Sequence, residues 1–94
     1  MGYSVEYRET ARKQLRKLDR SIAKRIVDYL DEVGALDDPR TRGKGLVGDR
    51  AGIWRYRVGD YRVLCELRDA ELVILALEVG HRSSVYDARV VRRH

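Results

Sequence analysis

Ninety-four residues, 44% of them apolar and 37% charged, are enough for one domain with a single core and too few for a second. Twenty lysines and arginines against fifteen acids give a net charge of +5, which suits an anionic partner without identifying one. Cys65 is the only cysteine, which excludes an internal disulfide, and the sequence starts with no leader or long apolar span, so we expect a cytoplasmic protein with no membrane partner.

The N-terminal part of the chain combines one strand with helices. Aromatic and apolar residues alternate with polar ones over about 3–8, which predicts a short strand. Over about 9–34, apolar residues recur at three- and four-residue steps and form one stripe on a helical surface. Asp19 and Ser21 are capping residues within this stretch, so a two-helix hairpin is favoured over a single kinked helix. The polar side of these helices is basic, and we interpret it as a solvated surface.

A loop separates the helices from the sheet. Acids, a proline and glycines break both periodicities over about 35–45, and a short strand is predicted at Leu46–Val47. The whole sheet is expected over about 46–80. Lys44, near the end of the loop, is a candidate to reach a basic face of this sheet, although most loop lysines are only solvated.

A β-hairpin is predicted over 53–67, where two alternating runs flank Gly59-Asp60. This two-residue turn places Arg57 opposite Arg62 and puts Arg55 on the same face. Like charges that face each other across strands are unfavourable by ~0.2–1 kcal/mol, so the three arginines favour an anion such as phosphate. The alternative is that nearby acids and solvent relieve them.

The last strand is predicted at Glu71–Val79, after a two-residue turn at Asp69-Ala70. Every position from Leu72 to Leu77 is apolar, which is typical of a strand buried on both faces. Cys65 is expected to face the helices as a core residue, together with Leu72 and the alternate residues after it. The opposite face of the strand then needs a cover, either the C-terminal segment or a second protein. Its residues are Val73, Leu75, Leu77 and Val79.

The segment after the last strand, about 81–94, carries side chains suited to phosphodiester chemistry. They are His81, because histidine is the side chain most often used for proton transfer near neutral pH, Arg82, because arginine binds phosphate with two hydrogen bonds, and Tyr86, because tyrosine can transfer a proton beside cations. No metal-ligand spacing and no phosphate-binding glycine loop accompany them, so we expect cleavage without a metal or cofactor. Taken alone, His81 and Tyr86 are more simply interpreted as packing residues.

These motifs in this order resemble the RelE family of bacterial toxins, within the RelE/ParE superfamily. RYRVGDYRV at 55–63 and VGHRSSVY at 79–86 carry the resemblance, which extends over nearly the whole chain. It implies one α+β domain over 1–94 with the order β-α-α-β-β-β(-α), in which a two-helix hairpin packs on one face of a twisted, mostly antiparallel sheet. It also implies an mRNA endoribonuclease that enters the ribosomal A site, uses no cofactor and is held inactive by a cognate antitoxin.

The resemblance assigns candidate residues by position. In the mechanism that it implies, the RNA 2′-hydroxyl attacks the adjacent phosphate and leaves a 2′,3′-cyclic phosphate. We expect Arg62 and Arg82 to be exposed. The candidates are Arg62, Arg82, Tyr86 and His81 for catalysis, and Arg55 and Arg57, with Lys44, for RNA binding.

The chain departs from well-known relatives at Arg55 and Arg57, where those proteins carry lysines. Arginine stays charged, so these two positions act electrostatically, and His81 or Tyr86 must transfer the protons. The sequence leaves open which of the two is the acid and which the base. Two other functions also remain: a ParE-like inhibitor of DNA gyrase, and a non-toxic nucleic-acid-binding module.

Overall fold

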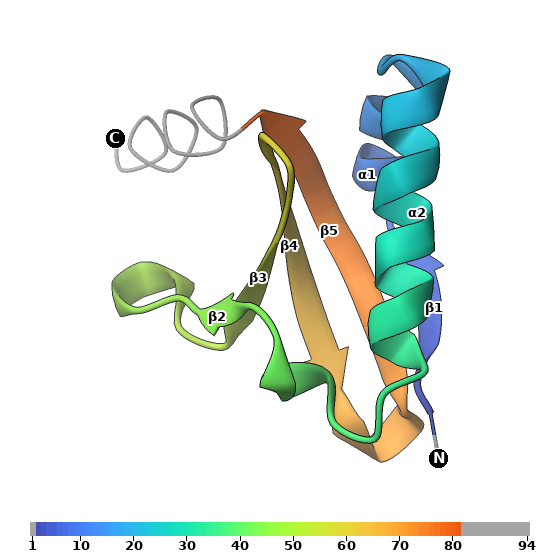
Figure 1. The fold of residues 1–94 in the computed structure, drawn as a ribbon. Coiled ribbons are helices and arrows are strands. Elements are labelled where there is room, and N and C mark those ends of the chain that lie inside the picture. The colour runs from blue at the N-terminus through green and yellow to red at the C-terminus, as the bar shows by residue number, and fades with distance from the viewer. Residues whose placement is uncertain (1, 82–94) are drawn as a thin grey trace.

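A computed structural model describes residues 2–81. Arg82, Tyr86 and any final helix lie outside the described residues. The α+β fold predicted from the sequence is confirmed: one strand, two helices and then the remaining strands follow each other along the chain (Figure 1). The elements are β1 (Ser4–Tyr7), α1 (Glu9–Arg16), α2 (Arg20–Gly34), β2 (Lys44–Gly45), β3 (Ile53–Val58), β4 (Tyr61–Arg68) and β5 (Val73–His81).

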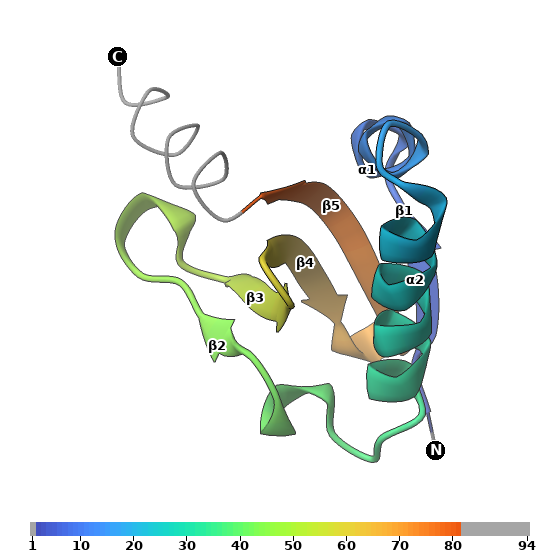
Figure 2. The ribbon, with the colours of Figure 1, turned by 45° about the horizontal axis from the view of Figure 1, so that its top comes forward.

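The five strands form one sheet in the order β1-β5-β4-β3-β2. β1 is parallel to β5, and every other pair is antiparallel. Figures 1 and 2 show both helices on the same side of this twisted sheet, alongside β1 and β5. The sheet therefore has one face covered by the helices and a second face, which we call the outer face.

The break between the helices is capped as the sequence predicts. α1 ends at Arg16 and α2 begins at Arg20, so the hairpin of two helices is confirmed. Asp19 accepts hydrogen bonds from the backbone N–H and the hydroxyl of Ser21, at 2.9 and 3.0 Å. Such a cap stabilises a helix by about 1 kcal/mol because it satisfies a backbone donor that would otherwise have no partner.

The hydrophobic core lies between the helices and the sheet. Ile26 and Leu30 of α2 are completely buried against Val63 and Ile74 of the central strands. Cys65 is a core residue, as expected, and burial raises the pKa of its thiol to about 12. The thiol is therefore neutral at physiological pH and unsuited to nucleophilic attack.

The short strand before the hairpin is Lys44–Gly45, so the prediction of a strand at Leu46–Val47 is wrong. Gly45 pairs with Trp54 and packs on its ring, where a Cβ would lie 3.0 Å from the ring. The apolar character of Val47 misled the prediction, since its side chain is 83% exposed.

The turn between β4 and β5 is longer than the predicted two residues. A 3-10 turn at Asp69–Glu71 is followed by Leu72 in the left-handed region, with φ of 56°. Leu72 is 40% exposed and does not join the core, contrary to expectation. The two-residue turn would have paired Cys65 with Ile74, but the longer turn pairs it with Ala76. Because the register moves by two residues, the side chains at the start of β5 stay on the predicted faces of the sheet.

A β-bulge at Leu77 changes the faces further along β5. Cys65 pairs with Ala76 but Leu64 pairs with Glu78, which leaves Leu77 without a partner. Val79 consequently faces the helices opposite Val63 and is buried, so its predicted place on the outer face is wrong. Glu78 takes that place instead.

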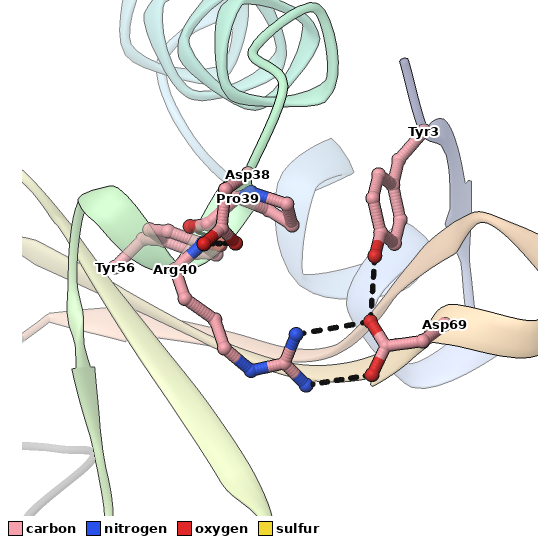
Figure 3. A network of polar contacts seen from close by, with 6 residues as sticks. All are labelled: Tyr3, Asp38, Pro39, Arg40, Tyr56 and Asp69. Carbon is pink, nitrogen blue, oxygen red and sulfur yellow. Dashed lines mark hydrogen bonds and ion pairs between the residues drawn. The ribbon is translucent and has the colours of Figure 1, made fainter. Parts of the chain in front are cut away.

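The loop between α2 and β2 is tied to the sheet by polar contacts (Figure 3). The guanidinium of Arg40 donates two hydrogen bonds to the carboxylate of Asp69, at 2.9 and 3.1 Å. The hydroxyl of Tyr3 donates a third to the same carboxylate, at 2.6 Å. The buried hydroxyl of Tyr56 donates to the carbonyl of Pro39 at 2.7 Å. These contacts fix the loop that leads to Lys44.

We predict that Asp69→Asn lowers stability at neutral pH and flattens the acid limb of the stability curve. The hydrogen bonds from Arg40 and Tyr3 lower the pKa of Asp69 in the folded state. The carboxylate therefore adds stability above its unfolded pKa of about 3.9, and this stability is lost as the pH falls through the lower folded value. Thermal melts of both proteins from pH 7 to pH 2 measure the effect. Asp49→Asn, an exposed carboxylate in another loop, is the control, and parallel curves for the wild type and Asp69→Asn would contradict the prediction.

Candidate functional site

Among the described residues, four neighbouring cations cluster on one part of the outer face of the sheet. The predicted hairpin register is confirmed, with Arg57 opposite Arg62 and Arg55 opposite Leu64. Lys44 of β2 pairs with Arg55, so this lysine lies on the same face. We call Lys44, Arg55, Arg57 and Arg62 the basic face.

Arg62 occupies the most enclosed position of the basic face. It is 4% exposed, so the expectation of an exposed arginine is wrong here, whereas Arg57 and Lys44 are exposed. Leu64, two residues along the strand on the same face, is also buried. A guanidinium removed from water interacts more strongly with a phosphate than a solvated one, because the effective dielectric constant is lower.

Two carboxylates of the central strands lie on the same face. Glu66 forms an ion pair with Arg68 at 3.2 Å, toward the other end of β4. Glu78, placed there by the bulge, lies 4.0 Å from Arg50. Arg50 ends the 3-10 turn Gly48–Arg50 and was missed by the sequence analysis, because a loop arginine beside glycines has no strand partner that would indicate its direction.

His81 does not join the basic face. It ends β5 opposite Tyr61, and the two rings pack edge to face with centroids 5.5 Å apart. Tyr61 itself packs against the core, so His81 lies on the helix side of the sheet. The other two predicted catalytic residues, Arg82 and Tyr86, lie outside the described residues.

Half-buried Tyr7 and buried Tyr56, both on the helix-covered side, are poor proton acceptors. Burial raises the pKa of Tyr7 to about 12 and raises that of Tyr56 still further. Both phenols are therefore neutral at physiological pH, and neither is suited to act as a base.

Residues 2–81 were also compared with what a metal site and a membrane-spanning helix require. Within residues 2–81, no group of three or more His, Cys, Asp or Glu side chains is placed to hold a metal ion. In the same part of the chain, no helix is long and apolar enough to cross a membrane. The main chemical feature of the outer face is therefore its density of positive charge.

Known proteins resemble this chain over most of its length. The sequence model of the family described as "ParE toxin of type II toxin-antitoxin system, parDE" matches residues 5–86. Toxin RelG of Mycobacterium tuberculosis is 34% identical over 87 residues, which cover 92% of this chain and 98% of the relative. The mRNA interferase toxin RelE of Escherichia coli K12 is 32% identical over 96 aligned positions, which cover 98% of each chain.

Solved structures agree with the sequence relatives. The toxin–antitoxin complex RelBE2 of M. tuberculosis contains a chain that superimposes with a TM-score of 0.79 at 30% identity, covering 86% of this chain and 92% of that one. A mutant of E. coli toxin RelE in the free state superimposes with a TM-score of 0.74 at 27% identity, covering 98% of both chains. The similarity therefore includes the strands that carry the basic face.

Proposed function

Because the chain belongs to the RelE/ParE family of toxins of type II toxin–antitoxin systems, we propose that it is an endoribonuclease that cleaves messenger RNA in the ribosomal A site. The observation that carries this proposal is the basic face, in which exposed Arg57 lies directly opposite buried Arg62. Two arginines facing each other repel, and an RNA phosphate between or beside them removes the repulsion. Because bacterial ribosomes are cytoplasmic, we propose that the protein acts in the cytoplasm.

The described cations divide into two roles under this proposal. Lys44, Arg55 and Arg57 hold phosphates that flank the cleaved bond, because they line the accessible part of the face. Arg62 stabilises the negative charge that gathers on the reacting phosphate, since its buried guanidinium is already fixed in place. We assign Arg82 to the same role, by the resemblance of its motif to the family.

The RNA itself supplies the nucleophile. Its 2′-hydroxyl loses a proton and attacks the adjacent phosphorus, the bond to the 5′-oxygen breaks, and that oxygen takes up a proton, which leaves a 2′,3′-cyclic phosphate. We propose Tyr86 and His81 for the two proton transfers. In the free protein the ring of His81 packs on Tyr61, so its participation requires the ring to leave Tyr61 when RNA binds.

A second function is favoured by one observation, the description of the matching family as ParE toxins. In this alternative the chain inhibits DNA gyrase and cuts no RNA. Induced expression followed by mapping of messenger 5′ ends separates the two. New ends at ribosome-covered codons, with unchanged supercoiling by purified gyrase, support the ribonuclease. Inhibited supercoiling without new RNA ends would overturn it.

We also propose a cognate antitoxin as the second partner. The RelBE2 structure from M. tuberculosis is a toxin–antitoxin complex, and the outer face here combines cations with the half-buried Leu75 and Leu77. An antitoxin segment that carries acids beside apolar residues fits this surface, because it neutralises the cations as it covers the leucines.

Hydrogen exchange tests the location of this contact. We predict that antitoxin binding protects amides of β3 and β4, which carry the three arginines of the basic face, and leaves α1 unchanged. Salt should weaken the complex, because charge pairs are screened. Protection confined to the basic side of the helices would contradict this placement of the antitoxin.

A further inference from the structure

An arginine outside the strands reaches the outer face from the connection between β2 and β3. Arg50 ends the 3-10 turn Gly48–Arg50, and its Nη2 lies 4.0 Å from Oε1 of Glu78 on β5. The bulge at Leu77 is the reason that Glu78 lies on this face, opposite Leu64. The loop and the bulge thus bring one additional cation and one carboxylate beside the basic face.

The contact between Arg50 and Glu78 is incomplete. The two side chains are only 18% and 29% exposed, yet 4.0 Å is too long for a hydrogen bond. Nη1 of Arg50 and Oε1 of Glu78 are both buried and have no hydrogen-bond partner. Buried polar atoms without hydrogen bonds are uncommon and costly, so this pair is poised to accept a better partner.

A phosphate group is such a partner for Arg50. Its oxygens accept two parallel hydrogen bonds from a guanidinium, which satisfies the donor that Glu78 leaves unpaired. The segment that carries Arg50 lies between Gly48 and Gly52, whose φ angles are 70° and 95° and whose missing side chains would meet only open space. Both ends of this short segment are therefore open around the backbone, and the Arg50 side chain is 18% exposed, so solvent and a phosphate can reach the guanidinium.

We propose that Arg50 is an additional phosphate-binding residue of the site and that Glu78 competes with RNA for it. This inference rests on the proposed ribonuclease function and goes beyond the residues that the motifs identify. In the free toxin, Glu78 holds Arg50 and reduces the positive potential of the face. When RNA arrives, its phosphate takes the guanidinium from Glu78.

The test is equilibrium binding to programmed ribosomes whose A-site codon carries 2′-O-methyl groups, which bind but offer no 2′-hydroxyl for attack. Arg50→Ala should bind about tenfold more weakly, because one charge-assisted contact is lost. Its log–log salt slope should fall by about 0.7, the value for one phosphate contact on a single strand. Arg50→Lys should keep most of that slope. Glu78→Gln should bind more tightly than the wild type.

The double variant, Arg50→Ala with Glu78→Gln, distinguishes competition for Arg50 from the general effect of removing a negative charge. If Glu78 acts by holding Arg50, Glu78→Gln tightens binding only when Arg50 is present. An equal gain in the Arg50→Ala background would overturn the coupling. Arg12→Ala removes a charge from exposed α1 and is the matched control, expected to bind like the wild type.

Arg57→Ala shows whether the basic face binds RNA at all. If it weakens binding while Arg50→Ala does not, the assignment of Arg50 is wrong and the proposed function stands. If neither variant changes binding, the proposed function itself fails, because RNA then does not use this face.

Discussion

Replacing Arg62 with glutamine is expected to slow messenger cleavage by about 10²–10³-fold, the usual cost of removing one preorganised group that stabilises transition-state charge. Arg62 is buried on the outer face with Arg57 opposite, so its guanidinium is held in place before RNA binds. The loss should fall on kcat, because Lys44, Arg55 and Arg57 still bind the flanking phosphates. Single-turnover cleavage at several toxin concentrations on programmed ribosomes separates the rate of the cleavage step from the strength of binding.

The same strand offers a matched control. Arg68 of β4 lies on the same face as Arg62, but it is engaged with Glu66 and Glu71 at the other end of the strand. Arg68→Ala should therefore cleave at the wild-type rate. Arg62→Gln should remain folded, because glutamine keeps a long polar side chain at this position and relieves the repulsion with Arg57. Wild-type cleavage by folded Arg62→Gln would remove this residue from the mechanism.

Local patterns were sufficient to predict the hairpin and the helices. The turn Gly59-Asp60 sets the register of β3 and β4 by itself, since two residues form the turn and alternation sets the faces. The cap at Asp19 likewise marks the break between helices within a few residues of sequence. The shared face of Arg55, Arg57 and Arg62 follows from the turn and the alternation alone.

Local sequence patterns could not predict the features that depend on contacts between distant segments. An uninterrupted apolar run such as that in β5 does not reveal a bulge, so neither the burial of Val79 nor the outward position of Glu78 could be predicted. In the longer turn at Asp69–Glu71, Asp69 accepts hydrogen bonds from Arg40 and Tyr3, which are far away in sequence. The contact between Arg50 and Glu78 was equally hidden, because the bulge is what turns Glu78 toward the outer face.

The core offers the second large effect, on stability rather than on cleavage. Ile74→Ala is expected to lower the free energy of unfolding by about 2–5 kcal/mol, because it removes buried methyl groups and leaves a cavity. Ile74 is completely buried and lies in β5 between Val5 of β1 and Leu67 of β4. In a domain of this size each kcal/mol shifts the melting temperature by about 4–8 °C.

The size of this effect follows from the position of Ile74 in the sheet. Among the strands of residues 2–81, β1 pairs with β5 alone, so a cavity between them loosens the edge strand as well as the core. Ile74→Val should cost much less, about 0.5–1.5 kcal/mol, since one methyl group is lost. Val47→Ala, at an exposed loop position, should stay within about 0.5 kcal/mol of the wild type. Equal melting temperatures for Ile74→Ala and Val47→Ala would mean that the helices do not pack on this part of β5.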